Sequence, residues 1–251
     1  MIRAALLCAA ITVLVAEERV GVVVVAPSAL APGIGGEVVV RFTIVPGWHL
    51  YWSNPGDSGL PPHLAWTLPP GWSAGEPRFP APERHDEDGM VTWVHHGTLD
   101  LVQRLVPPAD APAGAHELRL LATWLVCREQ CVPGRAELAA TVQVGPAVDA
   151  APPTGLPASA TDLGLTLAAV ADGRQVVLSV SGATAAPRRH PVAPAAEGVF
   201  AADHAAPLAA AAGWSVALPL VAGATLPPRL AGVLWDGPRA ATFDVPIAPI
   251  P

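Results

Sequence analysis

The chain contains no lysine, a single tyrosine and only three cysteines among its 251 residues. All 14 basic residues are therefore arginine, and a formal net charge of −7 leaves no basic patch of the kind that binds nucleic acid. After residue 16 no apolar run approaches the ~20 residues of a membrane helix, so we expect no membrane span in the mature chain. Phosphate-binding glycine loops, a Ser-His-Asp order and zinc-protease helices are also missing, which argues against those enzymes.

The amino terminus has the layout of a secretory signal peptide, because Met1–Arg3 is charged and Ala4–Ala16 is apolar. We predict a signal peptide over residues 1–16, which removes Cys8, and Ala29–Ala31 offers a second cleavage site. Export places the remaining cysteines in the periplasm, an oxidising compartment where disulfides persist.

Short β-rich runs dominate the rest of the chain, since 30 prolines and 23 glycines interrupt any long helical pattern. Turn-rich pieces such as Asn54–Gly59 separate the runs. The first group of runs is Val20–Val25, Val38–Val45, His63–Leu68, Met90–His95, Leu99–Val106, His116–Leu125 and Ala136–Val144. Strands at this spacing predict an all-β fold, an immunoglobulin-like antiparallel β-sandwich over residues 17–146.

A Pro/Ala-rich linker, residues 147–158, precedes a second β-rich region that we expect to form a smaller β-sandwich over residues 159–251. Within it, Ala205–Ala212 has helical propensity for a turn or two. The region carries no cysteine and no evident cluster of titratable groups, so we interpret it as a spacer or docking module.

Cys127 and Cys131 are the two cysteines expected in the mature protein. In a straight strand, residues four apart lie roughly 13 Å from each other, whereas a disulfide needs Cα atoms about 4.4–6.8 Å apart. A bond therefore requires the chain to reverse between them. Strand-like runs flank the pair, which predicts a β-hairpin with Arg128-Glu129-Gln130 at its tip.

A bond at this place has three interpretations. Closing a loop of about five residues stabilises by only roughly 2 kcal/mol, against about 4.7 kcal/mol for a hundred residues, so stability is a weak reason for it. Short, exposed pairs are typically labile, which favours a redox-active pair and a thiol:disulfide oxidoreductase component. An inert structural disulfide and half of a metal site are the alternatives. Arg128 would lower the pKa of a neighbouring thiol and Glu129 would raise it.

The adjacent pair His95-His96 suggests copper or zinc, because thiolate and imidazole suit either metal. Neighbouring strand residues point to opposite faces, so at most one of them could join Cys127 and Cys131. We therefore expect neither metal nor cofactor. Asp86–Asp88 is interpreted as a solvated loop rather than a pair of catalytic carboxylates.

Four segments carry a resemblance to a known family. Gly47–Pro61, with the sequence GWHLYWSNPGDSGLP, resembles the periplasmic amino-terminal domain of the thiol:disulfide interchange protein DsbD family, in its ScsB-like branch. Phe79–Arg84, Trp124–Cys127 and Cys131–Pro133 agree with the same family in the same order. The resemblance spans roughly Val20 to Val144.

The resemblance implies that Cys127 and Cys131 exchange electrons, although three residues separate them where the best-known members have five. Those members shield the pair with an aromatic residue on a cap loop. Here the corresponding stretch, His85–Met90, has none, and Trp93 is the nearest substitute. The residues expected to flank the site are Trp124, Arg128, Glu129, Tyr51, His49 and Trp93.

The implied partners are a membrane-embedded thiol reductase, acting in trans, and periplasmic thioredoxin-like or disulfide-isomerase-like proteins. Family roles in cytochrome c biogenesis and copper tolerance follow from the same resemblance. We predict that Cys131 meets the partner, with the reverse order left open. The alternative functions are a β-sandwich that binds protein or carbohydrate through its eight tryptophans, with a structural disulfide, and a copper-tolerance metal-binding domain.

Overall fold

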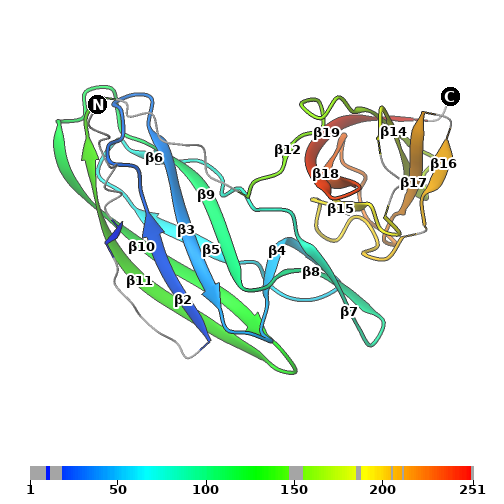
Figure 1. Cartoon of the computed structure of the whole chain (residues 1–251), viewed down its shortest axis with the longest axis horizontal. Coiled ribbons are helices and arrows are strands. Elements are labelled where there is room, and N and C mark those ends of the chain that lie inside the picture. The colour runs from blue at the N-terminus through cyan, green and yellow to red at the C-terminus, as the bar shows by residue number, and fades with distance from the viewer. Residues whose placement is uncertain are drawn as a thin grey trace, which may run out of the picture. The chain divides into compact units, whose positions relative to one another are not determined.

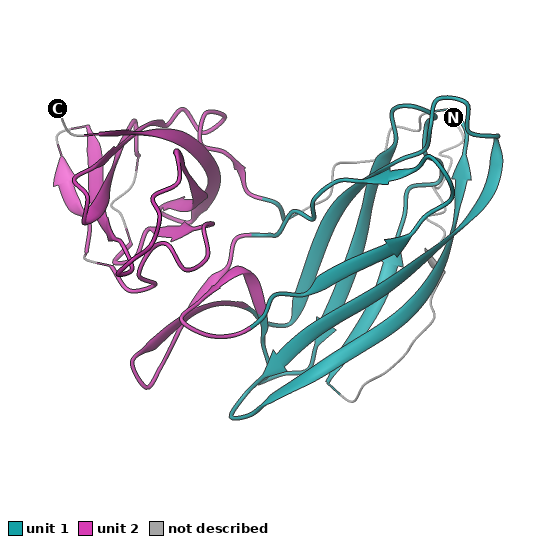
Figure 2. Ribbon diagram, turned by 180° about the vertical axis from the view of Figure 1, so that it is seen from behind, with its two compact units in different colours: residues 1–50, 60–80, 95–156 teal, residues 51–59, 81–94, 157–251 magenta. Residues whose placement is uncertain are grey.

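The computed structural model describes residues 10–11, 19–146, 155–184, 188–204, 206–210 and 212–249. These residues form strands and no helix, which confirms the all-β prediction (Figure 1). They divide into two compact units, coloured separately in Figure 2: unit 1 is residues 1–50, 60–80 and 95–156, and unit 2 is residues 51–59, 81–94 and 157–251. The domain boundaries expected from the sequence stay predictions.

Two of the sequence predictions fall largely on residues that are not described. The predicted signal peptide, with Cys8, lies outside the described residues except for Ala10–Ile11, which form strand β1. Residues 147–154 of the predicted linker also lie outside them, and Ala158–Ser159 form the short strand β12.

The first sheet of unit 1 has the order β1-β2-β3-β9-β6. Strand β2 (Val20–Val25) buries every second side chain, as expected of a strand with one face on a core. The antiparallel pairing continues from β2 to β3 (Gly36–Ile44), from β3 to β9 (Thr98–Val106) and from β9 to β6 (Ser73–Ala74).

The second sheet of unit 1 has the order β11-β10-β5, from β5 (His63–Thr67), β10 (Gly114–Cys127) and β11 (Cys131–Val144). The two sheets share one apolar core, in which Phe42 and Trp124 meet edge to face with ring centroids 5.6 Å apart. Each such buried side chain contributes about 1.5–3 kcal/mol. Packing against this core therefore holds β10 and β11 in place.

A third sheet has the order β4-β8-β7, from β4 (Leu50–Gly56), β8 (Met90–His95) and β7 (Glu83–Glu87). Strand β4 extends into the stretch expected to be turn-rich, and its Pro55 is accepted because β4 is an edge strand. Asp88 and Gly89 join β7 to β8 with φ values of 50° and 81°, the conformation of a two-residue hairpin turn. The expected loop at Asp86–Asp88 is therefore wrong for Asp86 and Glu87, which both lie in strand β7.

The remaining strands of unit 2 form the second β-sandwich, in the sheet order β15-β18-β19-β13-β14-β17-β16. Strand β19 (Arg239–Pro249) pairs antiparallel with β18 up to Pro246 and then parallel with β13 from Ile247, so it belongs to both layers. The other strands are β13 (Thr166–Ala171), β14 (Gln175–Ser181), β15 (Val192–Pro194), β16 (Leu208–Ala210), β17 (Gly213–Pro219) and β18 (Arg229–Asp236).

One expectation for unit 2 is wrong: the alanine-rich stretch expected to be helical contains strand β16. Leu208–Ala210 pair with Gly213–Ser215 of β17, so a tight hairpin overrides the helical propensity of alanine.

Candidate functional site

The cysteine pair lies at the end of the long hairpin of unit 1. Strands β10 and β11 pair without interruption from Gly114↔Val144 to Cys127↔Cys131, and Arg128-Glu129-Gln130 form the tip. The predicted hairpin is confirmed. Because Trp124 packs in the core only three residues before Cys127, the hairpin is held close to its tip.

The two cysteines are bonded to each other, and their Cα atoms lie 4.1 Å apart. Both main-chain groups of Cys127 bond to His49, with N···O distances of 2.9 and 3.0 Å, instead of to Cys131. In an antiparallel pair, residues that do not share hydrogen bonds approach more closely than those that do, about 4.5 against 5.5 Å. The register of the hairpin therefore places the two side chains at bonding distance.

The two cysteines differ in exposure. Cys127 is 2% exposed, whereas Cys131 is an exposed residue. Their places in the sheet explain the difference. Cys127 lies between Cys131 and His49, whereas Cys131 is the first residue of the edge strand β11. Solvent, and hence an incoming thiol, reaches the pair from the Cys131 side.

Two arginine side chains pack against Trp48, the residue before His49. The guanidinium groups of Arg19 and Arg128 lie 4.8 and 5.4 Å from the centre of the half-buried Trp48 ring. Such cation–π contacts hold the flexible arginine side chains near the tip of the hairpin. Glu129 is exposed at the tip. The two contacts gather two cationic side chains on Trp48, one of them from Arg128 at the hairpin tip beside Cys127.

Histidines lie on both sides of this region. The ring of His49 meets that of His96, with centroids 5.8 Å apart and planes at 70°. His95 points the other way and is 5% exposed, and its Nε2 has no hydrogen-bond partner among the described residues. Burial, helped by the charge of His96, lowers the pKa of His95 to about 4. His95 is therefore neutral at physiological pH.

The predicted flanking residues Tyr51 and Trp93 belong to unit 2, and their place beside the cysteines stays a prediction. Tyr51 is buried, and this burial raises the pKa of its phenol above the usual value. Trp93 stacks on Trp235, with ring centroids 6.0 Å apart and planes at 18°. Within the described residues, no group of three or more His, Cys, Asp and Glu side chains is arranged to hold a metal ion.

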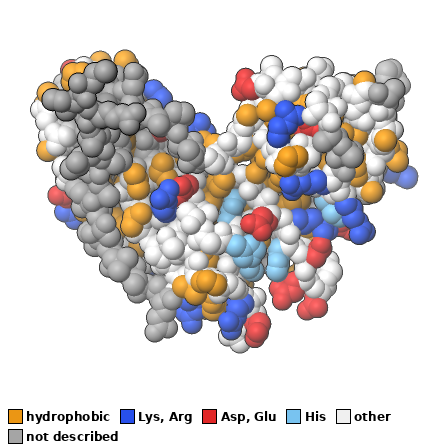
Figure 3. All heavy atoms as spheres, in the orientation of Figure 1, with side chains coloured by type: hydrophobic (Ala, Val, Ile, Leu, Met, Phe, Trp, Pro, Cys, Tyr) orange, Lys and Arg blue, Asp and Glu red, His pale blue; other side chains and the backbone are white. Residues whose placement is uncertain are grey.

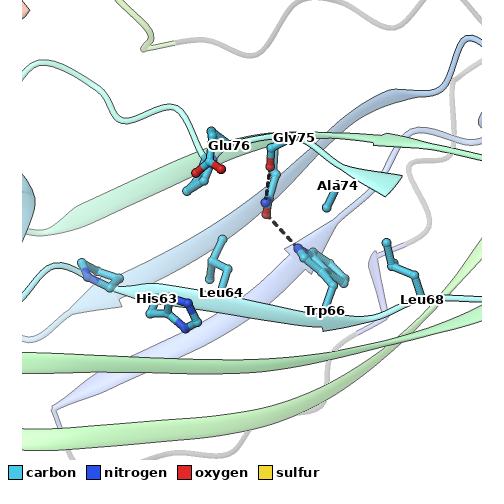
Figure 4. A pocket seen from close by; sticks show the side chains of 10 residues that line it. His63, Leu64, Trp66, Leu68, Ala74, Gly75 and Glu76 are labelled. Atoms are coloured by element: carbon cyan, nitrogen blue, oxygen red, sulfur yellow. Dashed lines mark hydrogen bonds between the residues drawn. The ribbon is translucent and has the colours of Figure 1, made fainter. Parts of the chain in front are cut away.

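Unit 1 also contains an open cavity of about 430 Å³ beside the edge strand β5 (Figure 4). Buried Gln103 spans it by accepting a hydrogen bond from Trp66 Nε1 at 2.8 Å and donating one to the carbonyl oxygen of Gly75 at 2.5 Å. The sequence alone did not single out Gln103, because it is one of several polar residues in β9 and nothing local marks it as buried. The glutamine fastens the edges of the two sheets to each other.

Comparisons with known proteins identify a family for residues 20–143 and a solved structure with the same fold. The family model described as "Thiol:disulfide interchange protein DsbD, N-terminal" matches residues 20–143. The crystal structure of the N-terminal periplasmic domain of ScsB from Proteus mirabilis has a TM-score of 0.66 at 18% identity, covering 96% of this chain and 98% of that one. It therefore has the same fold across both units.

A second structure is the reduced DsbD n-terminal domain of Neisseria meningitidis, at 23% identity, which covers 42% of this chain and 77% of that one with a TM-score of 0.31. No curated protein matches the chain. Among the described residues, no helix is long and apolar enough to cross a membrane.

Proposed function

The chain belongs to the DsbD amino-terminal family through residues 20–143, and we propose that it is a periplasmic thiol:disulfide interchange domain. In this proposal Cys127 and Cys131 relay electrons from a membrane-embedded thiol reductase to thioredoxin-like or disulfide-isomerase-like proteins. The observation that carries it is the unequal exposure of the bonded pair, buried at Cys127 and open at Cys131.

Reduction begins when a thiolate of the donor attacks the sulfur of Cys131. The Cys127–Cys131 bond breaks, Cys127 leaves as a thiolate, and Cys131 is held in a mixed disulfide with the donor. A second donor thiolate then attacks the donor's own sulfur and releases Cys131. The donor ends as a disulfide, and this domain has gained two electrons and, after protonation, two protons.

Delivery to an acceptor runs the same steps backwards. The Cys131 thiolate attacks the acceptor's disulfide, and Cys127 then attacks Cys131 to restore the internal bond and release the reduced acceptor. Cys127 suits this resolving role because its main chain is held by His49 at 2.9 and 3.0 Å, so its sulfur stays beside that of Cys131.

Trapping tests the proposal. In the Cys127→Ser variant the exposed Cys131 lacks its resolving thiol, so a mixed disulfide with the partner accumulates on a non-reducing gel of the exported protein. The Cys131→Ser variant captures far less, because Cys127 is buried. If neither variant captures a thioredoxin-like protein, and the bond of the unaltered protein has a potential below about −300 mV, the bond is structural and the proposal is wrong.

A further inference from the structure

Unit 2 contains an open cavity of about 340 Å³ whose walls carry three arginines. Arg188, Arg189 and His190 come from one stretch of the chain, and Arg84 comes from strand β7. Figure 3 shows arginine and histidine side chains gathered on the face of this unit that is turned to the viewer. The sequence-based view that this region has no cluster of titratable groups is therefore wrong.

Two tryptophans form the apolar part of the wall. Trp93 and Trp235 are 1% and 6% exposed and stack on each other. The Arg188 guanidinium lies 5.6 Å from the centre of the Trp235 ring, and its Nε donates to the carbonyl oxygen of Gly237 at 3.0 Å. These two contacts fix the guanidinium and leave its terminal N–H groups without a hydrogen-bond partner among the described residues.

Two buried polar atoms at the cavity also lack hydrogen-bond partners in the described part of the chain: Arg84 Nε and His190 Nδ1. The other nitrogens of Arg84 are paired with Asp86 and, at 3.0 Å, with Asp203. His190 Nδ1 lies 3.8 Å from Asp203, beyond hydrogen-bond distance. Buried polar groups are nearly always satisfied, so two unsatisfied ones in residues that line one cavity are exceptional.

The charges of the residues that line the cavity indicate that a ligand there would be an anion. Three arginines and one acid, Glu83, line the cavity, which leaves a local excess of positive charge. Asp86 and Asp203, which pair with Arg84, are 55% and 69% exposed and face solvent. Because Arg84 is already paired with Asp86, Arg188 and Arg189 against Glu83 leave one positive charge, which a singly charged anion balances.

We propose that this cavity is a binding site for a carboxylate group. Arg188 presents a planar fork of donors that matches the two oxygens of a carboxylate, and Arg189 has an uncommitted guanidinium among the described residues. Arg84, also in the wall, adds positive charge that Asp86 offsets. The carboxylate comes either from an acidic side chain of a protein partner or from a free organic acid.

Calorimetric titration of the full chain tests this site. The probes are sodium propionate, an end-blocked Ala-Glu-Ala peptide and sodium phosphate, all in sodium chloride of matched ionic strength. We expect both carboxylate probes to bind. The substitutions Arg188→Gln and Arg189→Gln should each weaken binding by about tenfold or more, because each removes a charge-assisted hydrogen bond. The control Arg174→Gln, an exposed arginine of the same unit, leaves binding unchanged.

NMR of the His190 ring gives a second measurement, which does not rely on the heat of binding. Burial and then the charge of Arg84 lower its pKa, while His204 and Arg189 lower it further and Asp203 opposes them. A bound carboxylate raises the pKa of His190, because negative charge favours the imidazolium form. The NMR signals of its ring report this shift, with those of His63 in unit 1 as reference.

Tighter binding of the peptide identifies an acidic protein segment as the source, and tighter binding of propionate identifies a free acid. Either result supports the site. Failure of both carboxylates to bind, stronger binding of phosphate than of either, or binding that survives both arginine substitutions overturns it. A variant lacking both Cys127 and Cys131 binds normally, so the outcome is independent of thiol exchange.

Discussion

His49 and Cys127 hold each other by their main chains: the N–H of His49 donates to the carbonyl oxygen of Cys127 at 2.9 Å, and the N–H of Cys127 donates back at 3.0 Å. This bridge does not involve the sulfur. Breaking the disulfide therefore leaves Cys127 anchored, and the freedom gained goes to the tip of the hairpin and to Cys131. The two sulfurs of the reduced domain are chemically unequal for that reason.

We expect the reduced protein to show this inequality directly. Iodoacetamide alkylates Cys131 at least about tenfold faster than Cys127, because only the exposed thiol is accessible without local opening. Mass spectrometry of the two cysteine-containing peptides over time measures both rates. In urea the rates converge, which is the control. Equal rates in the folded protein contradict an enclosed Cys127.

Substitution at position 49 separates the main-chain bridge from the imidazole. His49→Pro removes the N–H that bonds Cys127 and leaves a buried carbonyl group unpaired, at a cost of about 1–3 kcal/mol. His49→Ala removes only the side chain and its contact with His96. We expect the proline variant to be less stable to urea than the alanine variant and to alkylate faster at Cys127. The bridge is unimportant if the two variants behave alike.

The buried, neutral His95 makes the stability of the protein depend on pH. Its pKa is about 4 when folded and about 6.5 when unfolded, so the unfolded state binds the extra proton between those values. Stability is full above pH 6.5, falls as the pH drops through this window, and has lost about 3 kcal/mol from this group by pH 4. Urea unfolding at pH 7 and pH 4.5 measures the loss.

The control for this prediction keeps the rest of the chain constant. His95→Leu cannot take up a proton, so its stability changes less between the two pH values than that of the unaltered protein. His63→Gln, at an exposed position, leaves the change as it was. A His95→Leu variant with the full pH dependence assigns the effect to other groups.

An alanine substitution at Gly59 tests how tightly the Tyr51 ring is packed. The φ of Gly59 is +108°, and a Cβ atom there would lie 2.2 Å from Cε1 of the Tyr51 ring. Gly223 also has a positive φ, +80°, but nothing lies within 4 Å of its Cβ position. Both alanine variants suffer backbone strain, and Gly59→Ala loses a further ~1–3 kcal/mol because the ring must move. Equal losses in thermal unfolding show that Tyr51 is free to shift.

Local pattern located most of the strands. Val20–Val25 and Met90–His95 have the same bounds in the sequence prediction and in the structure. Richness in β-branched and aromatic residues is a property of the strand itself, so it is visible without the partner strands. β7 was missed because its sequence, ERHDE, has no apolar alternation, and pairing with β8 holds it in place.

Longer-range features escaped prediction for a related reason. The sequence contains Asn54 and Pro55 in what reads as a turn, yet β4 runs through them. The buried Asn54 side chain donates to the carbonyl oxygen of Pro194 at 2.8 Å, a residue 140 positions away. No local window of sequence contains both partners of such a bond.

By itself, the sequence determined that the protein is all-β and that a bond between Cys127 and Cys131 requires a turn, because strand period and bond length are local constraints. Only the tertiary structure decided that Cys127 is enclosed beside His49 while Cys131 is open, and that Arg84 joins Arg188 and Arg189 at one cavity. Exposure and charge clustering depend on which distant strands become neighbours, and that choice is made by the packing of the whole chain.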